Sequence, residues 1–187
     1  SGNDGYHLDS SDDTIIEEVN GGIDTVSVNR TSYTLGANLE NATAHAVQTG
    51  GVTLTGNGLA NVLTGASGAD TLRGLSGADK LVGGNGHDWM SGGTENDTIN
   101  GGSGNDVIDA RNGGIDTLTF GDGNDLAIFD DKLDASDVIN GAGTGVDSVS
   151  YTDVSVTGGS ELNQATGLEY VSVVGADGVV LTLASDA

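Results

Sequence analysis

Apolar side chains recur at every ninth position through the middle of the sequence. Residues 56–109 divide into six consecutive nonapeptides, and the eighth position of each is Leu, Met or Ile. Most residues beside these positions are polar, which is the pattern of a short strand with one side chain turned inward. The last three residues of each nonapeptide, such as 98–100, are therefore predicted to form strands. The inward positions are Leu63, Leu72, Leu81, Met90, Ile99 and Ile108.

Two further positions keep the same period. The first position of every nonapeptide is Gly, and the sixth is Asp in all but the first. Three positions that stay in step without an insertion indicate a true repeat. The first six residues are predicted to form a tight turn, which glycine favours because it reaches positive φ without strain. The glycines are Gly56, Gly65, Gly74, Gly83, Gly92 and Gly101, and the sixth positions are Asn61, Asp70, Asp79, Asp88, Asp97 and Asp106.

The period also predicts which aspartates meet. One loop and one strand make half a coil, so eighteen residues should complete a coil and loops at one edge should stack every second nonapeptide. Stacked strands lie about 4.8 Å apart, and carboxylates at that separation repel unless a cation lies between them. Ca²⁺ is suited to this role because it takes about six to eight oxygen ligands, both carboxylates and carbonyls. The predicted columns are Asp70, Asp88 and Asp106 at one edge, and Asn61, Asp79 and Asp97 at the other.

The nonapeptide G-G-x-G-x-D-x-U-x, in which U is apolar, is most complete in residues 83–109. With this pattern the sequence closely resembles the RTX, or haemolysin-type, calcium-binding repeat family. The resemblance implies an all-β fold, a right-handed parallel β-roll (a β-helix or solenoid) with a β-rich flanking cap, in which each Ca²⁺ bridges two stacked loops. It also implies a secreted or cell-surface bacterial protein that leaves the cell through the type I secretion machinery and folds outside. The sequence departs from the pattern at Leu59 and Glu95, which replace Gly, and at Asn61.

Several Ca²⁺ ions are the cofactor expected from these loops. The predicted side-chain ligands are Asp70, Asp79, Asp88, Asp97 and Asp106. Backbone carbonyl ligands are predicted at Gly65, Ser67, Gly74, Ser76, Gly83, Gly84, Asn85, Gly86, Gly92, Gly93, Thr94, Gly101, Gly102, Ser103 and Gly104. Degenerate repeats add Asp4, Asp24, Asp116 and Asp125 as candidates, whereas Asp109, at a ninth position, should face outward and matter little to stability.

Degenerate copies of the repeat flank the array. The segment 21–28 (GGIDTVSV) recurs at 113–120 and more loosely at 144–151, and Asp4 and Asp13 are again nine residues apart. Residues 1–4 recur at 103–106, so the chain is expected to begin inside a repeat and to be a piece of a longer protein. We expect three parts: degenerate repeats and a spacer at 1–54, the β-roll at 55–128, and a β-rich C-terminal cap at 129–187.

The spacer, residues 32–41, resembles a recurrent segment of large bacterial proteins in this family. Its alternating pattern predicts strands, with Leu39 and Leu54 closing the N-terminal end of the core. Residues 129–187 are strand-like as well. They are predicted to cover the open sheet edge that the last coil of a solenoid leaves.

The charge balance changes which partners are reasonable. Asp and Glu number 28 against 5 Lys and Arg, for a net charge of −23. Such a chain repels nucleic acid and anionic membranes, and it repels itself until cations bind. The absence of Cys excludes disulfides and thiolate metal sites, and no apolar run has the length of a membrane-spanning helix.

Other chemistry finds little support in the sequence. His7, His45 and His87 are scattered and lack the spacing of a zinc site. Paired carboxylates could suggest a glycosidase, but their nine-residue period is that of metal ligands, so we expect no enzyme. Trp89 should face outward and lie against a neighbouring segment. Nothing else in the sequence indicates a glycan or other surface ligand. The outward positions do not form a row of Thr residues, so ice binding is not indicated either.

Two roles for the larger protein stay open. The chain could be a structural module of an extracellular adhesin or surface-layer protein, which the spacer at 32–41 slightly favours. It could instead be the C-terminal secretion and folding module of a secreted enzyme such as a protease or lipase. The terminus at 181–187 carries no clear secretion signal and does not decide between them.

Overall fold

The computed structural model describes residues 2–10, 13–45, 50–129, 137–141, 143–151, 165–168, 170–174 and 180–184. These residues form strands, turns and extended segments, with no helix among them. Accordingly, this part of the chain contains no helix that could span a membrane. The strands are β1 (Gly5–Leu8), β2 (Thr25–Val28), β3 (Ser32–Thr34), β4 (Asn41–Ala44), β5 (Thr53–Thr55), β6 (Val62–Thr64), β7 (Thr71–Ser76), β8 (Lys80–Asn85), β9 (Trp89–Thr94), β10 (Thr98–Ser103), β11 (Val107–Asp109), β12 (Thr117–Asp122), β13 (Leu126–Phe129), β14 (Val138–Asn140), β15 (Ser148–Tyr151), β16 (Ala165–Thr166), β17 (Tyr170–Val174) and β18 (Val180–Ala184).

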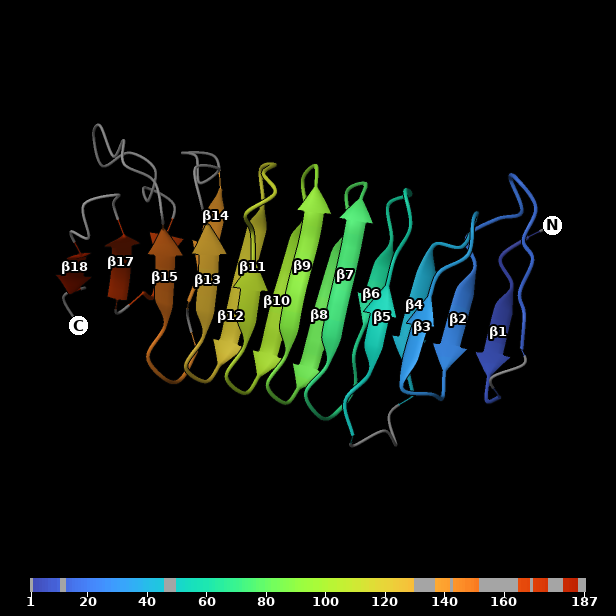
Figure 1. The fold of residues 1–187 in the computed structure, drawn as a ribbon, viewed down its shortest axis with the longest axis horizontal. Helices are drawn as coiled ribbons and strands as arrows, with labels where there is room; N and C mark the ends of the chain where they lie inside the picture. The colour runs from blue at the N-terminus through green and yellow to red at the C-terminus, as the bar shows by residue number, and fades with distance from the viewer. Residues whose placement is uncertain are drawn as a thin grey trace.

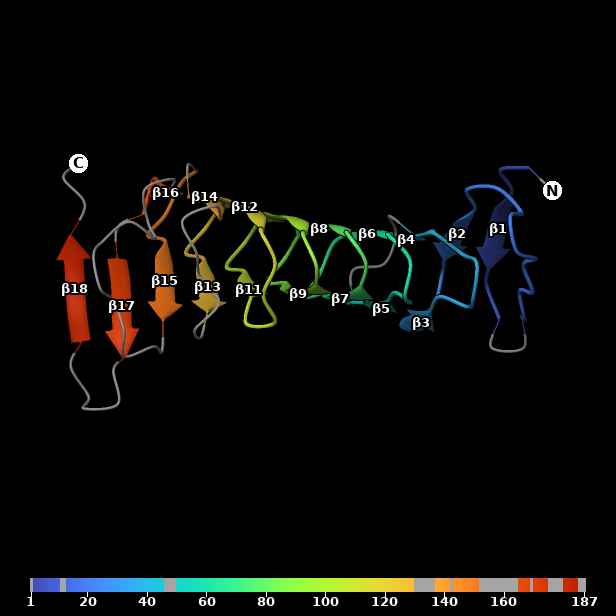
Figure 2. The ribbon, with the colours of Figure 1, turned by 90° about the horizontal axis from the view of Figure 1, so that it is seen from above.

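The strands form two sheets that face each other along the molecule (Figures 1 and 2). Sheet A has the order β1-β2-β4-β6-β8-β10-β12-β14-β16, and sheet B has the order β18-β17-β15-β13-β11-β9-β7-β5-β3. From β2 to β17 the chain alternates between the sheets, and every pairing is parallel except that of β17 with β18. The predicted all-β, parallel β-roll is therefore confirmed.

The predicted coil of eighteen residues is confirmed within the array. Lys80 pairs with Thr98 in sheet A, and Thr71 pairs with Trp89 in sheet B. Beyond the array the coils lengthen, since Thr98 pairs with Thr117 and β13 pairs with β15 at a still larger separation. The additional residues lie in the loops, so the strands of successive coils still pair residue by residue.

The core is a narrow double row of inward side chains. The eighth position of each nonapeptide is at most 1% exposed, as predicted. Leu39 and Leu54, expected to close the N-terminal end, are also fully buried. Burial of one such side chain is worth roughly 1.5–3 kcal/mol, so the core is a sum of similar small contributions along the solenoid axis.

Four strands of the array, β7 to β10, are longer than the sequence predicts, whereas β6 and β11 have the predicted three residues. β8 spans Lys80–Asn85, so it includes the first three residues of the following nonapeptide as well as the last three of its own. After β7 to β10 the turn is therefore confined to the fourth to sixth positions, and there the predicted six-residue loop is wrong. The pair of glycines reads as a turn in sequence, yet Gly84 at φ +113° still pairs with Gly102 of the next coil.

The two ends differ from the middle. At the N-terminus β1 pairs directly with β2 in sheet A, and Ile15 from the connection between them packs against the core. At the C-terminus the described strands continue the two sheets as far as β17, and β18 adds an antiparallel edge. The terminus at 181–187 lies partly outside the described residues.

Candidate metal centres

Aspartates form a continuous ladder along the edge where the chain passes from sheet A to sheet B. The N–H of Asp70 donates to Oδ1 of Asp88 at 2.8 Å, and the N–H of Asp88 donates to Oδ1 of Asp106 at the same distance. The ladder continues through Asp125 to Asp147. All five side chains are at most 2% exposed. The predicted first column is thus confirmed as a geometric unit, and it is longer than predicted.

A second ladder follows the opposite edge. The N–H of Asn61 donates to Oδ1 of Asp79 at 2.7 Å, and Asp79 donates in the same way to Asp97 at 2.8 Å. Asp97 donates to Asp116, which in turn donates to Asp137. The predicted position of Asn61 beside this column is correct. Its side-chain amide donates to the carbonyls of Leu39 and Glu40 in the preceding coil.

In several of these aspartates the second carboxylate oxygen has no hydrogen-bond partner. In the described part of the chain, Oδ2 is buried and without a hydrogen bond in five aspartates. A buried anionic oxygen left in this state is costly, on the order of 1–3 kcal/mol or more, and native proteins rarely keep one without a ligand. These side chains are Asp24, Asp79, Asp88, Asp106 and Asp125.

Burial shifts the acidity of the ladder. Loss of solvent raises the pKa of Asp79, Asp88 and Asp106 to about 6 each, and that of Asp97 to about 7. Neighbouring carboxylates add to the shift, as Asp106 and Asp70 do at Asp88. The one ion pair between described residues joins Arg111 to Asp109, outside both ladders. The ladders are therefore rows of buried carboxylates that lie outside this ion pair.

Three of these oxygens, those of Asp79, Asp88 and Asp106, lie against the first glycine of the repeat, where a larger residue would not fit. A Cβ built on Gly74 would lie 2.1 Å from Oδ2 of Asp79 and 2.4 Å from the carbonyl oxygen of Gly92. The same convergence of a carboxylate and a carbonyl oxygen is found at Gly83. The first glycine of the repeat is thus required for space, and not for positive φ. Hard oxygen donors of these two kinds are those that Ca²⁺ prefers, so the residues present fit this ion.

The predicted carbonyl ligands lie at the strand ends and turns of both edges. Some of these carbonyls also accept a hydrogen bond between coils, for example Asn85 from the N–H of Gly68 and Ser103 from the N–H of Gly86. A carbonyl oxygen has a second lone pair, so this bond leaves each able to contact a cation. Their role as ligands stays a prediction.

The degenerate repeats join the ladders only in part. Asp24, Asp116 and Asp125 are buried in the columns, and Asp4 donates its N–H to Oδ1 of Asp24 at 2.8 Å. Asp13 does not join, because it is exposed and accepts hydrogen bonds from the N–H groups of Asp9 and Ser10.

Sequence reasoning missed four acidic residues next to the ladders. Asp137 and Asp147 extend them, and each precedes an apolar strand, which was an available signal. Glu40 takes the place of an aspartate by accepting the N–H of Asp24 at Oε2, 2.8 Å away. Glu17 lies beside Asp4 and Asp24. No repeat pattern marks either glutamate.

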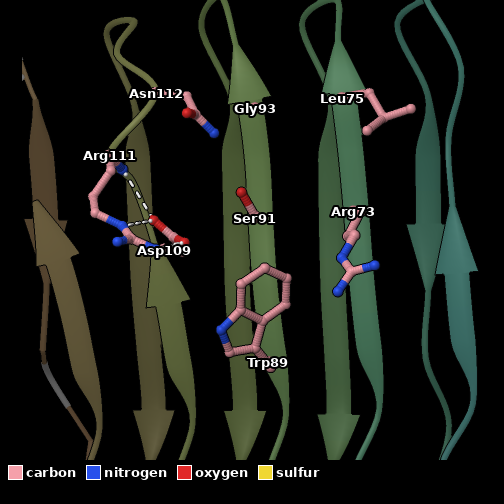
Figure 3. A pocket seen from close by; sticks show the side chains of 8 residues that line it. All are labelled: Arg73, Leu75, Trp89, Ser91, Gly93, Asp109, Arg111 and Asn112. Carbon is pink, nitrogen blue, oxygen red and sulfur yellow. Dashed lines mark hydrogen bonds and ion pairs between the residues drawn. The ribbon is translucent and has the colours of Figure 1, made fainter.

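Asp109 is not the inert position that the sequence predicts. It lies on the outer face of sheet B, as expected, but it is only 7% exposed. The guanidinium of Arg111 donates to both of its carboxylate oxygens, at 2.8 and 2.6 Å, and holds its pKa below the usual value (Figure 3). Loss of Asp109 would therefore remove a two-point ion pair.

Trp89 lines a shallow hollow of about 440 Å³ on the same face (Figure 3). The guanidinium of Arg73 lies 5.3 Å from the ring centroid, in cation–π range. Trp89 is thus half-covered, as expected, but by a side chain of the adjacent strand. Of the histidines, His7 and His45 make an edge contact with ring centroids 5.9 Å apart, and Nδ1 of His87 accepts the N–H of Asn105.

Comparison with known proteins identifies the central repeats. A family model described as "RTX calcium-binding nonapeptide repeat (4 copies)" matches residues 55–90, 82–114 and 91–127. No curated protein and no solved structure matches the chain. The matched segment coincides with the coils in which glycines and buried aspartates alternate at nine-residue intervals. Residues 55–127 therefore belong to the RTX calcium-binding nonapeptide repeats.

Proposed function

We propose that the chain is a structural module that folds around several Ca²⁺ ions held between stacked loops of the β-roll. The observation that carries this proposal is the row of buried Oδ2 atoms without hydrogen bonds, at Asp79, Asp88, Asp106 and Asp125, each in a ladder of like charges. Asp70, Asp88 and Asp106 would contribute ligands at one edge, and Asp79 and Asp97 at the other, with loop carbonyls beside them. Bound Ca²⁺ supplies the positive charge that the ladders lack.

The need for calcium also favours a location of the protein outside the cell. A chain with net charge −23 stays extended where free calcium is scarce, because its carboxylates repel, and it folds where calcium is abundant. We therefore favour a secreted or surface-exposed bacterial protein that passes through a type I exporter unfolded. An adhesin-like role is our first choice, because the coils form a long repetitive scaffold. A folding module of a secreted protease or lipase is the second.

Counting bound ions tests the proposal. We expect equilibrium dialysis of the whole chain at millimolar Ca²⁺, followed by atomic emission, to give several tightly held ions per molecule. A chain that binds none, or one at most, would refute a β-roll built on stacked calcium sites.

A further inference from the structure

A group of three carboxylates lies outside the RTX repeats, at the N-terminal end of the solenoid. One carboxylate oxygen from each of Asp4, Glu17 and Asp24 lies within 4.8 Å of the other two. Asp4 and Asp24 precede the paired strands β1 and β2. Glu17 comes from the connection between these strands and is not one of the positions that the repeat pattern marks. It is thus a third acidic side chain beside the two aspartates, and one that the repeat pattern does not supply.

Glu17 is held in place from two sides. The hydroxyl of Tyr6 donates to its Oε2 at 2.5 Å, and the side-chain amide of Asn38 donates to its backbone carbonyl at 3.0 Å. A Cβ on Gly21 would lie 2.0 Å from Oε1, so this glycine leaves room for the carboxylate. The carboxylate of Glu17 is therefore oriented by the fold.

Asp24 gives a second and independent sign of a ligand. Its side chain is 0% exposed, its Oδ1 already accepts the N–H of Asp4, and its Oδ2 has no hydrogen-bond partner. Within the described residues, none of the three carboxylates forms a salt bridge. A buried carboxylate oxygen without a partner, in a group of three carboxylates, is costly in the ionised form unless a cation binds there.

We propose that Asp4, Glu17 and Asp24 bind a Ca²⁺ ion at the N-terminal end of the solenoid, outside the matched residues 55–127, and that this ion fastens the connection between β1 and β2 to the first coil. The choice of Ca²⁺ rests on the proposed function, whereas the site itself is inferred from the positions of these three carboxylates. Three carboxylates carry more charge than two stacked ladder aspartates, and affinity for Ca²⁺ rises with the number of charged ligands. The N-terminal ion should therefore bind before the others and order the exposed edge strand β1.

The test compares Glu17→Gln with Glu18→Gln in the full chain. Glu18 is the adjacent glutamate and is exposed, so its substitution changes the net charge equally. We expect Glu17→Gln to bind one Ca²⁺ fewer by equilibrium dialysis, and Glu18→Gln to bind the wild-type number. An unchanged count in Glu17→Gln would overturn the site.

A variant that folds poorly could also bind fewer Ca²⁺ ions, so a second measurement reports on this site alone. In a Trp89→Phe background, Tb³⁺ at this site should be excited through Tyr6, whose hydroxyl contacts Glu17. We expect emission to fall in Glu17→Gln and in Tyr6→Phe, and to persist in Glu18→Gln and Asp88→Asn. Emission that is lost in Asp88→Asn but kept in Glu17→Gln would place the ion in the repeats alone. If no variant or parent binds Ca²⁺ or Tb³⁺, the proposed function itself fails.

Discussion

At the scale of single residues, the molecule depends on how each ladder aspartate uses its two oxygens. Oδ1 accepts the N–H of the aspartate one coil earlier, at 2.8 Å for Asp88 and Asp106. In Asp79, Asp88 and Asp106, Oδ2 is buried against the first glycine of the repeat and has no hydrogen bond, whereas Oδ2 of Asp70 accepts the N–H of Ala66 at 2.7 Å. One oxygen thus fixes the side chain, and the other is left for a cation.

Replacement of Asp88 by Asn tests this division of roles. The amide keeps an oxygen for the N–H of Asp70 but removes a charge between Asp70 and Asp106, so two adjacent sites should weaken. We expect a cost of roughly 3–5 kcal/mol, the scale of a broken buried ion pair, seen as a higher calcium midpoint for folding.

The control is Asn100→Ala, because Asn100 is exposed at a ninth position and should cost less than about 1 kcal/mol. Asp109 would be a poor control, since Arg111 binds it at two points. Equal midpoints for Asp88→Asn and Asn100→Ala would mean that the ladder does not carry calcium.

Protonation gives a second prediction at this scale. Burial raises the pKa of Asp79, Asp88 and Asp106 to about 6 and that of Asp97 to about 7. A raised pKa means that these groups favour the fold when protonated, so this contribution is complete below their ordinary value and is lost as the pH rises through 6 to 7.

Calcium binding should have the opposite dependence, because the ion requires the ionised form. We expect the calcium concentration at the folding midpoint to rise as the pH falls from 8 through 7 to 6. Circular dichroism titrations at each pH measure it. A midpoint that stays constant over this range would contradict buried aspartates as ligands.

At the scale of elements, the nine-residue period predicts the columns, the coil length and the inward row, because each depends only on spacing. It does not predict strand length, since the glycine pair of Gly83 and Gly84 has the composition of a turn but the pairing of a strand. Phe120 and Phe129 are fully buried after the array, where glycines would continue the pattern.

The acidic neighbours from longer connections could not be predicted in the same way. Glu17 and Glu40 reach the ladder region from segments whose length follows no repeat, so only the folded backbone brings them there. Asp109 was misjudged because its position in the repeat gives its face of the sheet, but not the partner that Arg111 provides.

A prediction at this scale concerns the first glycine of the repeat. Gly74→Ala would place a methyl 2.1 Å from Oδ2 of Asp79 and 2.4 Å from the carbonyl of Gly92. We expect it to cost about 1–3 kcal/mol through overpacking and to raise the calcium midpoint, because the carboxylate must move. In Gly58→Ala the added carbon meets nothing within 4 Å, and chemical denaturation in calcium should show little change. Equal stability of the two variants would contradict the claim that the first glycine is required for space.

At the scale of the whole molecule, a narrow core is combined with a net charge of −23. Each coil contacts only its neighbours, so stability accumulates along the solenoid and charge repulsion accumulates with it. A cation bound between two coils reduces the charge repulsion and also adds stability, because it joins adjacent loops.

The identity of the ion should matter as much as its charge. Mg²⁺ requires a tighter octahedral arrangement and gives up its waters reluctantly, whereas Ca²⁺ accepts irregular sets of carbonyl and carboxylate oxygens. We expect Mg²⁺ at equal concentration to fold the chain poorly, as measured by circular dichroism. Equal folding in both ions would reduce the role of calcium to general screening of charge.

The most direct test of the central claim is the far-UV circular dichroism of the whole chain in excess chelator at neutral pH and low salt, before and after calcium is added. The account predicts a disordered spectrum with chelator and a β spectrum once free Ca²⁺ reaches the millimolar range. A full β spectrum in chelator, unchanged by calcium, would contradict it.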